Sequence, residues 1–306
     1  MLTSKDITAI FTTYEPSKRL LNNIELMINQ VDSIIVVDDG SQSDVSLSIL
    51  KICSNYDKLT LHRNIDNLGI AHSLNIGLRM AEKNGYKWAL TMDQDSRPSS
   101  DMVYQLCNSY NKNERREQIS LVTPNIIDEE NPDKLGSLLI NSRNLFYKTV
   151  AMPNHDRDDL LITITSGSLT NISKFKKAGP FPTEFFIDYV DTYLSLKLVD
   201  LGYIILYSCS AKLYHNLGEP RVMKVANRHV RALNHKPYRR YYMARNSLYM
   251  YHEFALKQPS WALYDLYIGI YSTIAILLFE DKKVTKLSLS LKGFYHAILG
   301  KKGKYN

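Results

Sequence analysis

Residues 87–96 read KWALTMDQDS, an apolar run that ends in two aspartates separated by a single residue. The run is typical of a buried strand, so Asp93 and Asp95 are expected at the strand's carboxyl end. Two carboxylates placed there can share a divalent cation and leave coordination positions open for phosphate oxygens, as Mg²⁺ sites usually do. A solvated turn is the alternative, but the position directly after the strand favours a metal site.

The first 125 residues alternate β-branched runs with amphipathic segments. Strands are predicted at 7–13, 33–39, 58–63 and 87–93, with helices at 17–30, 44–55, 70–85 and 100–111. This order predicts an α/β fold with a mostly parallel sheet and helices on both faces. Ligands of such sheets bind at the carboxyl ends of the strands, so polar residues at those ends are candidate site residues.

Two more strand ends carry such residues. Thr12 and Glu15 lie at the end of the first strand, and Asp38 and Asp39 end the second, just before Gly40. An Asp-Asp-Gly-Ser sequence is also good turn chemistry. Two acidic strand ends in one sheet nevertheless favour carboxylates that accept hydrogen bonds from a base or ribose, with Gly40 allowing close backbone approach.

A third acidic pair lies in FFIDYVDTYLSLKL at residues 185–198. If this segment is helical, Asp188 and Asp191 share one face of the helix. Either aspartate could instead cap the helix. A carboxylate in such an aromatic setting can also have a raised pKa and accept a proton from an attacking hydroxyl.

The rest of the chain is less regular. We expect a loop and a hairpin over 126–160, a strand ending at 166–168, a helix from about 189 to 202, and helices beyond about 223. This division predicts an α/β domain over 1–220. A helical region follows over 221–306.

Charge and composition narrow the class of protein. The net charge of +7 is unevenly distributed. The C-terminal region has an excess of basic residues, because residues 221–306 hold 16 Lys and Arg against 4 Asp and Glu. Neither a G-x-x-x-x-G-K-[ST] loop nor a G-x-G-x-x-G after the first strand is present, which argues against simple NTPases and dehydrogenases. Three widely spaced cysteines fit a reducing compartment. The N-terminus has no signal-peptide pattern, so secretion is not expected.

The motifs together resemble the family 2 glycosyltransferases with a GT-A fold. The ordered set is TTYEP, IIVVDDGS, NLGIAHSLNIGL, LTMDQDS, TSGSL, FFIDYVDTYLSLKL, YHNLG and PYRRYYMARN, spanning Ile7 to about Asn246. DQDS, FIDYVD and RRYYMARN make the chain most similar to the bacterial rhamnosyltransferases that build surface polysaccharides. The resemblance implies an inverting, metal-dependent transfer from a nucleotide-diphosphate sugar to a saccharide. It also implies that residues 1–220 form the nucleotide-sugar-binding and catalytic domain.

The resemblance also implies a role for each candidate residue. The nucleoside would be bordered by Thr12, Glu15, Asp38 and Asp39, and Mg²⁺ or Mn²⁺ would be held by Asp93, Asp95 and His215. The catalytic base would be Asp191, supported by Asp188. The diphosphate or acceptor would be contacted by Arg239, Arg240 and Arg245. His215 could instead be simply packed, and the arginines could be a solvated basic stretch. Relatives often carry Glu at Tyr193 and Arg at Lys197, which weakens any claim about those two positions.

The implied donor is dTDP-β-L-rhamnose, giving an α-linked product on an acceptor that we expect to be lipid-linked. Other classes remain as alternatives: a UDP-hexose transferase, a non-catalytic saccharide-binding or scaffold protein of the same fold, and a phosphohydrolase that uses a strand-end D-x-D. A nucleic-acid binder is not expected, because residues 1–220 are acidic and carry no such motif.

The C-terminal segment bears on location. Ser260 could cap a helix whose apolar core, Leu266 to Phe279, has 14 residues and is expected to be too short to span a membrane. Lysines follow this core, which fits an interfacial helix on an anionic leaflet. A homodimer or an intramolecular contact fits equally well. We expect a cytoplasmic protein. If the helix is interfacial, the protein would be peripheral on the inner face of the plasma membrane.

Overall fold

A computed structural model of the chain describes residues 1–129, 136–142, 145–215, 221–225, 228–232 and 234–305. The strands of the described residues are β1 (Ile7–Thr13), β2 (Ser33–Asp38), β3 (Leu59–Arg63), β4 (Trp88–Asp93), β5 (Arg97–Pro98), β6 (Ile119–Asp128), β7 (Ser137–Ile140), β8 (Lys148–Ala151), β9 (Ser168–Asn171), β10 (Ile204–His215), β11 (Arg221–Val225) and β12 (Arg228–Ala232). The α-helices are α1 (Arg19–Met27), α2 (Asp44–Cys53), α3 (Ile70–Lys83), α4 (Met102–Lys112), α5 (Ile172–Ala178), α6 (Val190–Asp200), α7 (Pro237–Phe254), α8 (Pro259–Phe279) and α9 (Lys283–Ile298).

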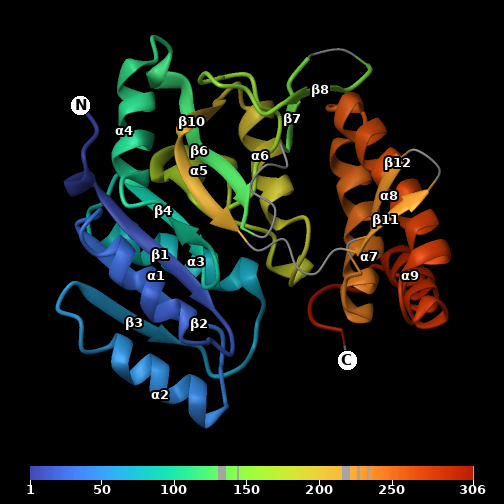
Figure 1. Ribbon diagram of the computed structural model, residues 1–306, viewed down its shortest axis with the longest axis horizontal. Coiled ribbons are helices and arrows are strands. Elements are labelled where there is room, and N and C mark those ends of the chain that lie inside the picture. The colour runs from blue at the N-terminus through green and yellow to red at the C-terminus, as the bar shows by residue number, and fades with distance from the viewer. Residues whose placement is uncertain (130–135, 143–144, 216–220, 226–227, 233, 306) are drawn as a thin grey trace. The chain divides into compact units, whose positions relative to one another are not determined.

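The central sheet of the described residues has eight strands in the order β3-β2-β1-β4-β9-β6-β10-β5, and helices cover both of its faces (Figure 1). Strands β1 to β4 run parallel, while β9 is antiparallel to both of its neighbours. All seven residues of β1 are buried, as expected of a strand covered on both sides. The predicted α/β architecture is confirmed.

The parallel register brings the predicted strand ends to one edge of the sheet. In β1, Thr12 lies opposite Asp93 of β4, and Thr13 lies opposite Asp38 of β2. The acidic ends of β2 and β4 therefore flank the end of β1, where parallel sheets bind their ligands.

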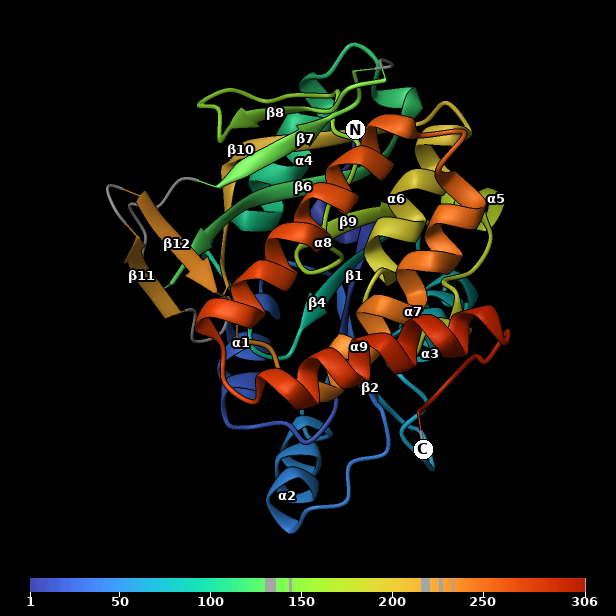
Figure 2. The same cartoon turned by 90° about the vertical axis from the view of Figure 1, so that its right-hand side faces the viewer.

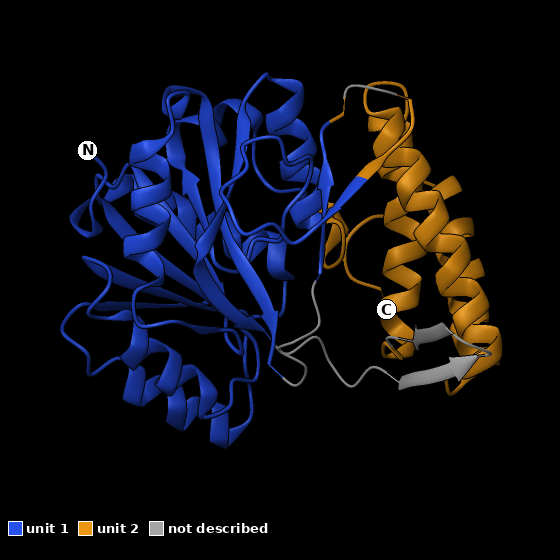
Figure 3. Ribbon diagram, turned by 45° about the horizontal axis from the view of Figure 1, so that its top comes forward, with its two compact units in different colours: residues 1–141, 149–183, 190–216 blue, residues 142–148, 184–189, 217–306 orange. Residues whose placement is uncertain are grey.

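The chain forms two compact units (Figure 3). The first unit contains residues 1–141, 149–183 and 190–216, and the second contains 142–148, 184–189 and 217–306. The expected boundary at 220 lies outside the described residues. Two short segments from the first two thirds of the sequence belong to the second unit, which a division in chain order does not foresee.

Two local expectations were wrong. The structure places Asp188 before α6, with a φ of 65°, so it does not share a helix face with Asp191. α8 begins at Pro259 with Gln258 as its N-cap, so Ser260 does not cap it.

The helix expected there is present as α8, which has 21 residues. The expectation that it is too short to span a membrane was wrong by length and composition. Among the described residues, α8 alone is long and apolar enough to cross a membrane, judged by length and composition.

Candidate active site

Three side chains at the carboxyl edge of the sheet form a candidate metal centre. Asp93 ends β4, Asp95 follows two residues later, and His215 ends β10. One ligand atom from each lies within 4.8 Å of the others. Two carboxylates and one imidazole fit a divalent cation such as Mg²⁺ or Mn²⁺, and three protein ligands leave positions for phosphate oxygens.

His215 is held by a chain of serines. Its Nδ1 lies 2.6 Å from Ser96 Oγ, and Ser166 Oγ donates to Ser96 Oγ at 2.9 Å. Ser166 Oγ in turn accepts from the backbone N–H of Asp93 at 3.1 Å. If Nδ1–H donates to Ser96, Nε2 keeps its lone pair, which is how metal-bound histidines are usually oriented. Burial lowers the pKa of His215, with Asp95 and Asp128 opposing the effect, which favours the neutral imidazole.

Gln94 links the loop that carries Asp93 and Asp95 to the end of β1 through hydrogen bonds. Its Oε1 accepts from Thr13 Oγ1 at 2.5 Å and from the N–H of Tyr14 at 3.0 Å, and its Nε2 donates to the carbonyl of Tyr14. Sequence reasoning missed Gln94, Ser96 and Ser166 as positioning residues. The DQDS motif contains the first two, but its spacing alone does not show which side chains they meet.

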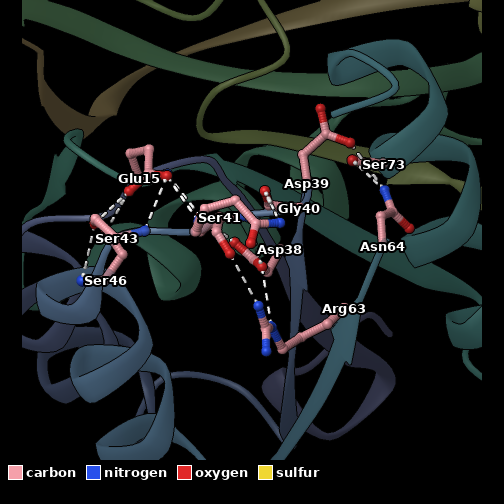
Figure 4. A network of polar contacts seen from close by, with 11 residues as sticks. Glu15, Asp38, Asp39, Gly40, Ser41, Ser43, Ser46, Arg63, Asn64 and Ser73 are labelled. Atoms are coloured by element: carbon pink, nitrogen blue, oxygen red, sulfur yellow. Dashed lines mark hydrogen bonds and ion pairs between the residues drawn. The ribbon is translucent and has the colours of Figure 1, made fainter. Parts of the chain in front are cut away.

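The second acidic pair is engaged inside the protein. Asp38 is fully buried, pairs with Arg63 at 3.2 Å, and accepts from both the N–H and the hydroxyl of Ser41 (Figure 4). Asp39 accepts from the backbone N–H groups of Leu68 and Gly69 at 3.0 and 2.8 Å. Asp38 therefore shapes the turn after β2, and Asp39 orders the loop that leads into α3.

Gly40 has a φ of 78°, and a Cβ there would lie 2.5 Å from the backbone carbon of Asp66. The close approach predicted at Gly40 is thus made by the chain's own backbone. A side chain at this position would meet both steric overlap and a left-handed backbone.

Glu15 ties the end of β1 to the start of α2. Its carboxylate accepts from the N–H of Gln42 at 2.8 Å, and from the hydroxyls of Ser43 and Ser46. These hydrogen bonds, chiefly that of the Gln42 N–H, lower the pKa of Glu15 to about 2. Thr12 is buried in β1 beside them. The four predicted nucleoside residues thus lie at or just after the ends of two adjacent strands, and at least three of them stabilise loops at the sheet edge.

Asp191 lies in the first turn of α6, which begins at Val190. Its Oδ1 accepts from the N–H of Thr192 at 2.8 Å, one of the N–H groups that have no partner within the helix. A small cavity beside it is also lined by Thr163, Thr165 and Ser195.

The segment just before α6 is held in an uncommon conformation. Phe186, Asp188 and Tyr189 all have left-handed backbones, with φ between 64° and 65°. Such conformations cost about 1 kcal/mol or more for each residue other than glycine. Asn246 of α7 opposes this cost, because its Nδ2 donates to the carbonyls of Phe185, Ile187 and Asp188 at 3.1, 2.9 and 3.2 Å.

The three arginines of α7 have different surroundings. Arg239 pairs with the carboxylate of Asp188. Arg240 is buried and pairs with Glu280 at 2.7 Å. Arg245 is fully buried and donates to the carbonyls of Glu184, Phe185 and Gly303. Arg240 and Arg245 therefore stabilise the second unit, and Arg239 is the most exposed of the three.

Comparison with known proteins identifies the family. Residues 8–179, more than half of the chain, match the family described as Glycosyl transferase family 2. The chain belongs to this family. It is therefore a glycosyltransferase, and the match covers the sheet edge that carries Asp93 and Asp95. His215 and Asp191 lie beyond the matched residues.

Individual relatives agree with this assignment. The glycosyltransferase is 27% identical over 245 residues to the dTDP-rhamnosyl transferase RfbF of Shigella flexneri, covering 80% of this chain and 79% of RfbF. Its fold is similar to that of S. aureus TarS 1–349 in complex with UDP-GlcNAc, with a TM-score of 0.61, 16% identity, and coverage of 95% of this chain and 81% of TarS. GalNAc-T7 with UDP, GalNAc and Mn²⁺ gives a TM-score of 0.54 at 12% identity, over 72% of this chain and 44% of GalNAc-T7. The expected GT-A fold is thereby confirmed.

Proposed function

We propose that this glycosyltransferase moves L-rhamnose from dTDP-β-L-rhamnose to a saccharide acceptor, with inversion at the anomeric carbon. The observation that carries the proposal is the convergence of Asp93, Asp95 and His215 at the carboxyl edge of the sheet. The similarity to a dTDP-rhamnosyl transferase over 80% of the chain supports the choice of donor.

Asp93, Asp95 and His215 would hold Mg²⁺ or Mn²⁺. When bound, the cation would neutralise charge that develops on the leaving nucleotide diphosphate. The neutral imidazole favoured at His215 suits this role. Ser96 and Gln94 would act by keeping the ligands in place.

Asp191 would accept the proton of the acceptor hydroxyl as that oxygen bonds to the anomeric carbon. The bond from the anomeric carbon to the diphosphate oxygen breaks in the same displacement, and the electron pair leaves with the diphosphate. Asp188 and Arg239, which pair with each other, would contact the sugar or diphosphate. Thr12, Glu15, Asp38 and Asp39 would border the nucleoside, largely by ordering the loops around it.

We further propose a cytoplasmic enzyme of surface polysaccharide synthesis with a lipid-linked acceptor. The three cysteines are free thiols, two of them buried, which suits a reducing compartment.

A donor screen tests the proposal. The purified protein would be incubated with dTDP-rhamnose, UDP-glucose, UDP-galactose or UDP-GlcNAc, each with Mg²⁺, Mn²⁺ or EDTA, and release of the nucleotide diphosphate measured. Fastest turnover of dTDP-rhamnose that is lost in EDTA supports the proposal. Faster turnover of a UDP-sugar supports the alternative donor, and protection against thermal unfolding without turnover of any donor would favour a non-catalytic saccharide-binding protein.

A further inference from the structure

Helix α8 exposes an unusually apolar surface. Its one charged residue, Asp265, lies on the inner side, where its carboxylate accepts hydrogen bonds from Tyr189 and Tyr251 at 2.9 and 2.7 Å. The exposed large apolar residues of α8 are Leu266, Tyr267, Ile268, Ile270, Tyr271, Ile274, Leu277 and Leu278. Single exposed apolar side chains are ordinary, but a contiguous group of this size marks an interaction surface.

The spacing shows that half of these residues form one stripe. Leu266, Ile270, Ile274 and Leu277 follow one another at intervals of three or four, the period that keeps side chains on one face of a helix. The buried residues Trp261, Ala275 and Ile276 are on the remaining face.

Helix α9 continues the pattern. Val284, Leu291, Tyr295 and Ile298 also share one helix face, and their exposed fractions are 82%, 70%, 60% and 77%. The inner face is packed against α7, where a Cβ at Gly293 would lie 2.3 Å from a backbone oxygen. Figure 2 looks onto both helices, which are joined by the three residues 280–282.

Exposed lysines lie in the same part of the chain as these apolar stripes. The exposed lysines among the described residues from 257 to 305 are Lys257, Lys282, Lys283, Lys292, Lys301, Lys302 and Lys304. In the same range the described residues include one exposed acidic side chain, Asp281. Glu280 is buried, where Arg240 and Lys286 bind it at 2.7 and 2.8 Å. The exposed charge of residues 257–305 is therefore strongly cationic, although Lys302 pairs with Glu184 at 3.7 Å and Lys292 donates to Tyr305.

We propose that the outer faces of α8 and α9, called here the α8–α9 face, dock on a membrane surface that contains anionic lipid. Apolar side chains bounded by lysines and tyrosines are the combination that an interfacial helix needs. A second copy of the chain fits less well, since its equal set of lysines would meet the first across the interface. A spanning α8 would expose Asp265 to lipid and break its contacts with α7.

The proposal goes beyond sugar transfer and can be tested without it. The full-length protein would be mixed with phosphatidylcholine vesicles, with or without phosphatidylglycerol, and bound protein measured by flotation at low and high salt. We expect binding to the anionic vesicles only, and weakening with salt as the charges are screened.

Two sets of surface variants locate the contact. K282Q/K283Q/K292Q should weaken binding roughly a hundredfold, because each basic residue near an anionic surface contributes about fivefold. I270Q/I274Q/L277Q should weaken it by a similar factor or more. The matched controls are the exposed sets K51Q/K83Q/K112Q and V45Q/I52Q/I65Q in the first unit, which should bind like the wild type.

Three outcomes would overturn the proposal. The first is no flotation at low salt together with a dimeric mass in solution that I270Q/I274Q/L277Q reduces to a monomer, because the face would then join two copies. The second is equal binding by the test and control variants. The third is protein in cell membranes that resists extraction by alkaline carbonate, because α8 would then span the bilayer. Turnover of dTDP-rhamnose by each soluble variant would show separately whether the proposed activity holds.

Discussion

Replacing Asn246 by alanine should slow catalysis while leaving donor binding nearly intact. The amide of Asn246 donates to three carbonyls of the segment that ends at Tyr189, two residues before Asp191. A hydrogen bond in such a buried setting contributes about 1 kcal/mol net, so the variant should lose about 2–3 kcal/mol. Three left-handed residues store a similar energy, about 3 kcal/mol.

The lost hydrogen-bond energy and the strain of the left-handed residues are of similar size, and this decides the expected result. With the amide removed, the segment keeps the hydrogen bonds of Arg245 to Glu184 and Phe185. Other contacts are made by its side chains and include the pairing of Asp188 with Arg239 and the hydrogen bond of Tyr189 to Asp265. The segment should then populate relaxed conformations, and Asp191 should be correctly placed less often. We expect kcat for dTDP-rhamnose turnover to fall by roughly ten- to a hundredfold, with KM for the donor changed less than about threefold.

The control is Ser247→Ala in the same turn of α7. Ser247 is also buried, but its hydroxyl donates to the carbonyl of Ala244 within the helix. Urea unfolding would measure stability, and steady-state kinetics would separate kcat from KM. A stable Asn246→Ala protein with wild-type kcat would refute the reasoning, as would an equal loss of kcat in Ser247→Ala.

Three further predictions concern the first unit. Asp95→Asn should remove most turnover and most metal-dependent nucleotide binding, measured by calorimetry, without changing the urea midpoint; unchanged wild-type activity in EDTA would contradict the metal role. Asp191→Asn should keep donor affinity but lower kcat by roughly a hundredfold or more, the usual scale for a positioned base; a collapse of donor binding would instead make Asp191 a ligand contact. The pKa of Glu15 lies at about 2, below its unfolded value, so its contribution to stability is complete above about pH 4.5 and is lost as the pH falls toward 2. Glu15→Gln should therefore flatten the acid side of the stability profile, measured by thermal unfolding between pH 7 and pH 3, and an unchanged slope would contradict the assignment.

The first four strands of the sheet and its acidic edge could be predicted from the sequence, because they depend on local patterns. The apolar run before Asp93 predicts a buried strand, and parallel pairing then places its end beside Thr12 of β1, with Asp38 of β2 on the other side of β1. His215 could be proposed only by resemblance, since 120 residues separate it from Asp95. Its orientation through Ser96 and Ser166 depends on packing that no spacing reveals.

The arginine-rich motif shows where prediction from the sequence fails. Arg239, Arg240 and Arg245 look alike in the sequence, and guanidinium groups suit phosphate. A buried guanidinium must satisfy its donors, and in Arg245 they are satisfied by backbone carbonyls from residues far apart in the chain. No sequence pattern marks a carbonyl as an acceptor, so the buried arginines could not be told apart from Arg239.

Helix α7 connects the predicted role of Asn246 with the proposed lipid contact of the α8–α9 face. One side of α7 binds the left-handed segment through Asn246 and Arg245, and α9 packs against α7 at Gly293. Residues 299–305, the C-terminal tail, contact the same segment, because the carbonyl of Gly303 accepts from Arg245 and its N–H donates to the carbonyl of Glu184. Removing the tail would therefore disturb the segment before Asp191 as well as lipid contact, which is why surface variants, and not truncations, separate the two roles. If the α8–α9 face docks on lipid, the segment that continues into Asp191 is carried by a membrane-bound unit. This arrangement suits the role that we propose for Asp191, with the acceptor hydroxyl on a lipid-linked saccharide.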